Sequence, residues 1–197
     1  MLPFHDTGIT RWEEVRSCGD NDKSAIMTLE LFLLRHVKSS WDIAGQDDFL
    51  RDLAPRGIRA GKSLGRLMAA RSWVPDLVLC SSATRTRRTL DLLVESWDRN
   101  PQVEMLRSLY LASQEQILDI IVRQPDSAPR LMVVGHNPGL QRAGRALSHP
   151  GRLRDELIAK YPTGGLLRLH FDVCDWAAIG RGTIVDYIRP RELEADP

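Results

Sequence analysis

Two arginines and two histidines are the residues of this chain whose types and positions best suit chemistry. Arg35 and His36 end the apolar run LELFLLRH, Arg85 follows DLVLCSSAT, and His136 follows RLMVVG. Guanidinium groups bind phosphate oxygens in a bidentate fork. A neutral imidazole is a good nucleophile near pH 7 when one ring nitrogen is unprotonated and aimed at phosphorus. Together the four side chains would form a phosphate pocket with a built-in nucleophile.

The elements that must position these residues follow an α/β pattern. From residue 28 onward, short apolar runs alternate with longer amphipathic segments, as expected for a mostly parallel sheet with crossover helices. The predicted strands cover residues 29–36, 76–82, 103–108, 130–135, 164–171 and 182–190. The predicted helices cover residues 55–73, 83–97, 113–124, 139–147 and 152–160.

Three of the predicted strands end in reactive or basic residues, and this placement predicts a common site. Ligands of open parallel sheets bind outside the carboxyl ends of the strands. The segments RH, SSATR and GHNPG should therefore meet in one crevice. No aspartate or cysteine cluster near them offers metal ligands, so a phosphate is favoured over a metal ion.

The fifth predicted strand, residues 164–171, has an alternating pattern. Leu167, Leu169 and Phe171 alternate with Arg168 and His170. We expect one face of this strand to meet solvent, which favours a place near the sheet edge.

Composition narrows the class of protein. The 197 residues carry a formal net charge of +1 and are 43% hydrophobic, so neither nucleic acid nor an anionic membrane is expected as a partner. No apolar stretch approaches the roughly 20 residues of a membrane-spanning helix. The cysteines Cys18, Cys80 and Cys174 form no CxxC pair, which favours a reducing, cytoplasmic setting. Residues 1–27 are polar and lack periodicity, and we expect them to form a flexible N-terminal extension.

Six motifs are spread along the chain: LFLLRHVKSSW, DDFLRDLAPRG, PDLVLCSSATRTRRT, LYLAS, VVGHNPGL and YPTGGLLRL. Together they make the sequence similar to the histidine phosphatase superfamily, and within it to the small SixA-type phosphohistidine phosphatases. The resemblance extends from residue 28 to about residue 190. It implies one histidine phosphatase domain over residues 28–197, with the three-layer, phosphoglycerate-mutase-like α/β fold. It also implies a phosphatase that needs neither a metal ion nor any other cofactor.

The resemblance assigns roles to individual residues. His36 matches the nucleophile that becomes phosphohistidine, and Arg35 and Arg85 match the phosphate-binding arginines. His136 matches the second pocket histidine, which hydrogen-bonds the transferring phosphoryl group. Ser39 lies where family members often offer a hydroxyl to the phosphate.

Several basic residues near these motifs leave alternatives open. Arg87 or Arg88 could take the pocket position instead of Arg85. Arg51 and Arg56 flank the DLAP turn and are expected to brace it rather than touch substrate. Lys38 extends the positive rim of the pocket or is simply an exposed lysine.

Two features depart from the usual pattern of the family. Val37 follows the nucleophile where the family usually has glycine or alanine, and we expect it to have a tolerable φ and to alter the pocket wall slightly. No carboxylate stands out as a general acid, and Glu104 and Glu115 are the nearest candidates in chain order.

The lack of a clear general acid bears on which type of phosphorus bond the protein would cleave. An alkoxide leaving group needs a proton in the transition state, whereas a protonated phosphoimidazole leaves as neutral imidazole. The sequence therefore favours removal of phosphate from a phosphohistidine on a signalling or phosphotransfer protein. A phosphomonoesterase for a small phosphorylated metabolite and a non-catalytic phosphate-binding module remain as alternatives.

Overall fold

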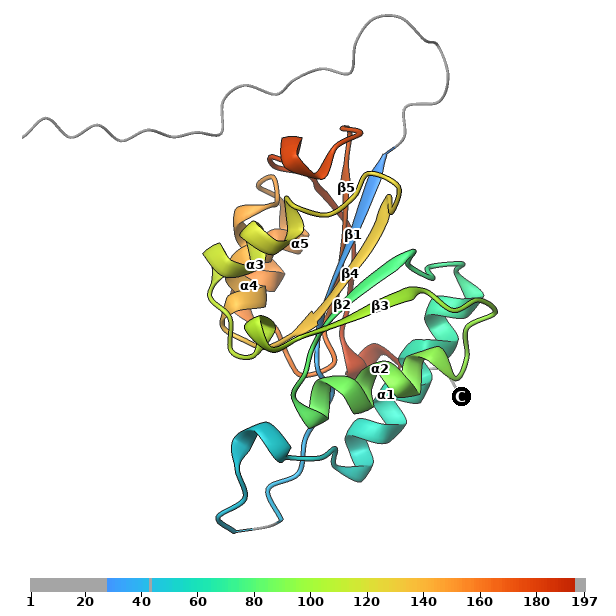
Figure 1. Ribbon diagram of the computed structural model, residues 1–197, viewed down its shortest axis with the longest axis vertical. Helices are drawn as coiled ribbons and strands as arrows, with labels where there is room; N and C mark the ends of the chain where they lie inside the picture. The colour runs from blue at the N-terminus through green and yellow to red at the C-terminus, as the bar shows by residue number, and fades with distance from the viewer. Residues whose placement is uncertain (1–27, 43, 194–197) are drawn as a thin grey trace, which may run out of the picture.

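A six-stranded sheet forms the centre of the structure, a computed structural model that describes residues 28–42 and 44–193 (Figure 1). The strands are β1 (Leu29–Arg35), β2 (Leu77–Ser81), β3 (Gln102–Leu106), β4 (Arg130–Gly135), β5 (Leu166–Phe171) and β6 (Thr183–Ile188). Their order across the sheet is β3-β2-β4-β1-β5-β6. Neighbouring strands pair in parallel except for β5, which is antiparallel to both β1 and β6. The expected extension over residues 1–27 lies outside the described residues.

Helices cover both faces of the sheet, which confirms the predicted three-layer α/β class (Figure 1). The helices are α1 (Pro55–Ala70), α2 (Thr84–Val94), α3 (Gln114–Ile121), α4 (Gly139–Ala146), α5 (Arg152–Ala159) and α6 (Pro190–Leu193). Short 3-10 helices lie at η1 (Asp48–Leu50), η2 (Arg107–Leu109) and η3 (Trp176–Ala178). None of the helices in the described part of the chain has the length and apolar character needed to cross a membrane.

The period-2 alternation of β1 explains how one strand supplies two cores. Leu31 and Leu33 pack in the core under α3, α4 and α5, and Phe32 and Leu34 pack in the core under α1 and α2. These four side chains are fully buried. The nearly continuous apolar run in the sequence is therefore a central strand covered on both faces, as predicted.

The partly polar face of β5 differs from its prediction in one respect. β5 is next to the edge strand β6, so its place near the sheet edge is confirmed. Its polar residues are not left to solvent, however. Arg168 contacts both Glu30 and Asp186, and His170 Nε2 lies 3.0 Å from Glu30 Oε1. A cross-strand ion-pair cluster thus covers most of this face.

The parallel register of β1 and β4 decides which residues meet at the end of the sheet. Arg35 pairs with Gly135, and the backbone N–H of His36 donates to the Gly135 carbonyl. The next residues along the two strands, His36 and His136, must therefore lie side by side. The carboxyl end of the sheet is the place where the sequence predicted a site.

The turn after His136 requires a glycine where α4 begins. A Cβ atom at Gly139 would lie 2.0 Å from the Ala112 carbonyl oxygen, which belongs to the backbone and cannot rotate away. We expect Gly139→Ala to destabilise the fold by about 2 to 4 kcal/mol, since the backbone must shift to relieve the overlap. Urea unfolding would measure this loss. Gly180→Ala is the matched control, because no atom lies within 4 Å of its added Cβ, and equal stabilities of the two variants would contradict the expectation.

Candidate active site

His36 follows β1 and presents one unprotonated ring nitrogen to the pocket. Its Nδ1 lies 2.8 Å from the backbone carbonyl of Val37. A carbonyl oxygen only accepts hydrogen bonds, so Nδ1 carries the proton and Nε2 keeps its lone pair. Arg85 Nε donates to this Nε2 over 3.3 Å. His36 is 7% exposed, so its unprotonated nitrogen is largely shielded from solvent.

Arg85 lies in the first turn of α2 and bridges the two histidines. Its Nε donates to His36, and its Nη2 lies 3.3 Å from His136 Nδ1. The Nε–Nη2 edge of a guanidinium is one of the edges that binds oxyanions in bidentate fashion. This edge faces the space between the imidazoles. Arg87 and Arg88 are exposed, so Arg85 is the arginine of this helix that belongs to the pocket.

His136 follows β4 and is held by the end of β2. Its Nε2 lies 2.8 Å from Ser81 Oγ, and the His36 and His136 ring centroids lie 5.3 Å apart. Because Arg85 can only donate, Nδ1 of His136 is the acceptor and Nε2 carries the proton. A proton gained at Nδ1 would make His136 a donor toward a phosphoryl oxygen.

Arg35 reaches the pocket from the end of β1 and leaves one donor unused. Its Nη1 donates to the Tyr161 carbonyl over 2.7 Å. Its Nε is buried and has no hydrogen-bond partner among the described residues. A buried N–H without a partner costs free energy, so this group is ready to bind an anion. The structure thus brings together the four residues that the sequence placed in one site.

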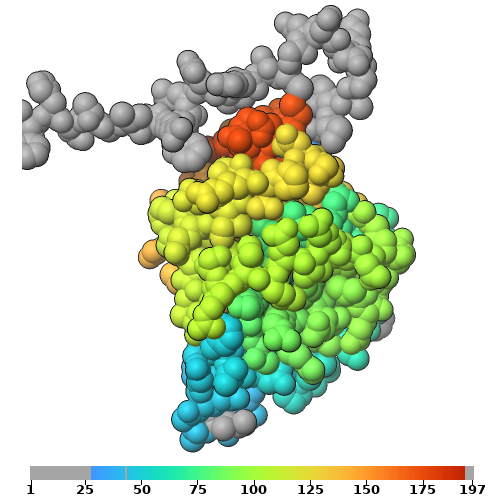
Figure 2. Space-filling view, in the orientation of Figure 1, coloured from blue at the N-terminus to red at the C-terminus, as the bar shows by residue number. Residues whose placement is uncertain are grey.

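Asp48 is a fifth residue of the pocket, which sequence reasoning missed. It lies in η1, within a segment that projects from one end of the domain (Figure 2). Its carboxylate accepts from Arg85 Nη2 at 2.9 Å, Tyr110 OH at 2.8 Å and Arg51 Nη1 at 2.7 Å. The signal was present in the DDFLRDLAPRG motif, but only the fold shows that this carboxylate meets Arg85.

The Ser39 hydroxyl is held by Arg51. Its hydroxyl accepts from Arg51 Nη2 over 2.6 Å, and Ser39 also forms a backbone bridge with Leu53. Arg51 is buried and donates to the Ser40 carbonyl as well as to Asp48. Arg51 thus braces the 39–53 segment, in keeping with the prediction made for it.

Neither candidate general acid lies with the four pocket residues. Glu104 is in the middle of edge strand β3, and its carboxylate accepts from Gln102. Glu115 is exposed in the first turn of α3 and accepts from Ser113 Oγ over 2.7 Å, a bond that lowers its pKa. Position along the chain suggested both residues, but their elements direct them to other surfaces. The prediction that one of them protonates a leaving group in this pocket is not supported.

Val37 does not crowd the pocket. Positive φ at non-glycine residues occurs only at Ser72 and Leu111 among the described residues, so Val37 carries no such strain. Its side chain is buried in a small cluster with Leu53 and Leu92. Its backbone N–H donates to Thr89 and its carbonyl fixes the His36 ring. The branched side chain therefore packs beneath the site.

Burial and positive charge keep both histidines neutral. Burial lowers the pKa of His36 to about 3, and the charges of Arg85 and Arg35 act in the same direction against the opposing hydrogen bond to Val37. Burial, His36 and Arg85 likewise lower the pKa of His136 to about 3. The lone pair of His36 Nε2 is therefore available throughout the physiological pH range.

Asp48 is ionised in the same pocket. Partial burial opposes its charge, but hydrogen bonds from Arg51 and Tyr110 and the charge of Arg85 outweigh this effect and lower its pKa to about 2. No group of three or more His, Cys, Asp or Glu side chains that could hold a metal ion occurs among residues 28–42 and 44–193.

Comparisons with known proteins found relatives of similar sequence. No family model matches the chain. An uncharacterized protein of Mycobacterium tuberculosis is 31% identical over 164 residues, which cover 80% of this chain and 100% of that protein. An uncharacterized chloroplastic protein of Arabidopsis thaliana is 32% identical over 135 residues, which cover 64% of this chain but only 62% of the plant protein.

Similarity to a solved structure indicates the family to which this chain belongs. The protein from Agrobacterium tumefaciens assigned as the phosphohistidine phosphatase SixA is 29% identical, with a TM-score of 0.72, and the match covers 82% of this chain and 98% of that one. The chain belongs to the histidine phosphatase superfamily, and SixA-type members are among the proteins to which its fold is similar.

The neutral histidines predict a pH-dependent stability. Below pH 6.5 the unfolded chain binds protons at positions 36 and 136 that the folded protein excludes, so the free energy of unfolding falls as the pH falls. From pH 7 to pH 5 we expect a loss of about 2 kcal/mol or more from these residues. Urea unfolding of the wild type and of a His36→Asn/His136→Asn variant would measure it. The same pH dependence in both proteins would contradict this account.

The Asp48 charge predicts weaker anion binding than the arginines alone would give. At pH 7 its carboxylate shares Arg85 with any bound phosphate and repels it. We expect Asp48→Asn to bind inorganic phosphate about tenfold more tightly, as measured by calorimetry. Tyr110→Phe keeps the charge and serves as the control. Weaker binding by Asp48→Asn would mean that the carboxylate mainly holds Arg85 in place.

Proposed function

We propose that the protein is a metal-independent phosphatase that removes phosphate from a phosphohistidine on another protein, through a phosphoenzyme at His36. The observation that carries the proposal is that the unprotonated His36 Nε2 contacts the Nε–Nη2 edge of Arg85, and that the carboxylate in the same pocket, Asp48, is ionised. The family membership supports a phosphatase reaction, and the assignment of the Agrobacterium tumefaciens relative supports a phosphohistidine substrate.

The first step transfers the phosphoryl group from the substrate. The lone pair of His36 Nε2 attacks phosphorus, a new N–P bond forms, and the substrate N–P bond breaks with its electron pair on the departing imidazole. If the departing ring is protonated at its other nitrogen, it leaves as neutral imidazole without further help. Arg35 and Arg85 stabilise the charge on the equatorial oxygens.

The second step returns the enzyme to its starting state. A water molecule attacks phosphorus, the N–P bond at His36 breaks, and its electron pair returns to Nε2. Both protons of the water remain with the product, which leaves as dihydrogen phosphate. The bond from Nδ1 to the Val37 carbonyl holds the ring in one tautomer through both steps.

The ionised Asp48 favours an N–P over an O–P substrate. A phosphate ester needs a proton on its leaving oxygen, and a carboxylate with a pKa of about 2 holds no proton at pH 7. Asp48 also accepts three hydrogen bonds from basic and hydroxyl donors, which stabilise its charged form. This reasoning ranks a protein phosphohistidine ahead of a small phosphomonoester.

Rapid-quench experiments with a 32P-labelled phosphohistidine carrier protein would test the proposal. We expect labelled phosphoenzyme in the wild type within one turnover, and a loss of at least 1,000-fold in rate with His36→Ala, since the acceptor atom is gone. His170→Ala is the matched control, because this histidine lies in the Glu30 ion-pair cluster.

Two results would overturn the proposal. Turnover of p-nitrophenyl phosphate with no loss of label from the carrier would point to a phosphomonoesterase. Phosphate binding with no phosphoenzyme from either donor would point to a non-catalytic module.

A further inference from the structure

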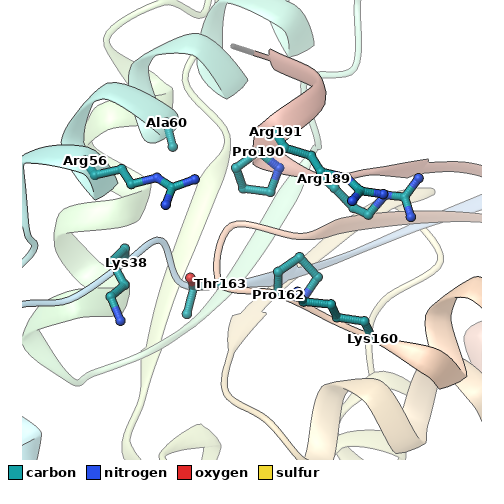
Figure 3. Close-up of a pocket in the computed structure, with 9 residues that line it drawn as sticks. All are labelled: Lys38, Arg56, Ala60, Lys160, Pro162, Thr163, Arg189, Pro190 and Arg191. Carbon is teal, nitrogen blue, oxygen red and sulfur yellow. The ribbon is translucent and has the colours of Figure 1, made fainter. Parts of the chain in front are cut away.

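A basic cavity lies beside the candidate active site. It has a volume of about 270 Å³ and is bounded by the first turns of α1, the turn before β5 and the residues after β6 (Figure 3). Its lining residues are Lys38, Arg56, Ala60, Lys160, Pro162, Thr163, Arg189, Pro190 and Arg191. Five of these nine are basic and none is acidic. The chain as a whole has 27 basic and 26 acidic residues, so this excess is local.

The cavity and the His36 pocket share one wall. The Tyr161 carbonyl accepts from Arg35, and the Gly164 N–H lies 3.0 Å from the carbonyls of both Arg35 and His36. Pro162 and Thr163, which lie between these contacts, line the cavity. A molecule whose phosphoryl group is on His36 could therefore place a neighbouring group in the cavity.

Close packing fixes the elements that carry the cations. The Lys38 carbonyl accepts from the Ala54 N–H over 2.9 Å, and a Cβ at Gly57 would lie 2.1 Å from that carbonyl oxygen. Gly164 has a φ of +77° and packs against Pro190. The backbones on both sides of the cavity are therefore held in place.

The charges of the cavity are only partly neutralised. Arg189 pairs with Glu156 and Glu192. Within the described part of the chain, Lys160 and Arg191 form no ion pair, and both side chains are exposed. Figure 3 shows Lys38 and Arg56 on one side of the cavity, and Lys160 and Arg189 on the other.

We propose that this cavity binds an aspartate or glutamate side chain that lies next to the phosphohistidine on the substrate protein. The inference rests on the proposed function. The exposed cations are spread over the cavity rim, an arrangement that suits a charged protein surface, because complementary charges steer and align two surfaces. A second phosphate on a small metabolite would use the same chemistry, and the experiment separates these two sources.

The test uses two phosphohistidine peptides that differ at one flanking position, glutamate or glutamine. For the wild-type enzyme we expect kcat/KM to be about tenfold higher with the glutamate peptide. Lys160→Gln/Arg191→Gln should lose this preference and keep the wild-type rate with phosphoramidate, a small donor that cannot reach the cavity. Lys62→Gln/Arg123→Gln removes the same charge from exposed positions outside the cavity and should retain the preference.

The outcomes distinguish this inference from the proposed function. Equal turnover of both peptides by the wild type, or an unchanged preference in Lys160→Gln/Arg191→Gln, overturns the cavity assignment alone. A preference for sugar bisphosphates over monophosphates that is lost in the same variant, with no peptide preference, overturns it in favour of a second phosphate. No turnover of either peptide, with phosphate esters still hydrolysed, means that the proposed function itself is wrong.

Discussion

The guanidinium of Arg85 is the group on which the geometry of the pocket depends, because it contacts both histidines from one fixed position. Its Nε donates to the unprotonated nitrogen of His36, and its Nη2 faces His136. On its other side it donates to the carbonyl and the carboxylate of Asp48. A planar group with five donors can satisfy all these acceptors at once, which the single ammonium of a lysine could not do in this arrangement.

The electrostatics of the pocket follow from this arrangement. Burial and the neighbouring arginines together disfavour a proton on either imidazole, so the cations proposed to bind phosphate also keep His36, the proposed nucleophile, neutral. The carboxylate of Asp48 offsets part of the positive charge, and Arg51 ties that carboxylate to the 39–53 segment. The pocket is therefore basic enough to bind an oxyanion and is stable when it holds none.

The segment before β5 gives the site a second boundary. Its backbone contacts Arg35 and His36 on one side and lines the basic cavity on the other. Tyr161 anchors this segment, since its hydroxyl donates to the Leu33 carbonyl within the core. One turn therefore borders both the proposed catalytic pocket and the basic cavity.

Sequence patterns predicted the elements of the fold because the pattern of apolar residues reflects burial. Every strand and helix predicted from the sequence is present, and their ends differ by a few residues, as at α1, which ends at Ala70. The strand ends also indicated the four central residues, since parallel strands place their carboxyl ends on one edge of the sheet. Family resemblance then distinguished a phosphate pocket with a histidine nucleophile from a generic anion site.

Contacts between residues far apart in the chain were decided only by the tertiary structure. Asp48 reaches Arg85 because η1 lies over the start of α2, and Ser39 turns to Arg51 because of its bridge to Leu53. Glu104 and Glu115 lie elsewhere because chain order says nothing about the direction of a side chain. The sequence determined which residue types follow each strand, because local patterning encodes secondary structure. Packing decided which of them touch, because register, loop path and burial are set by the whole domain.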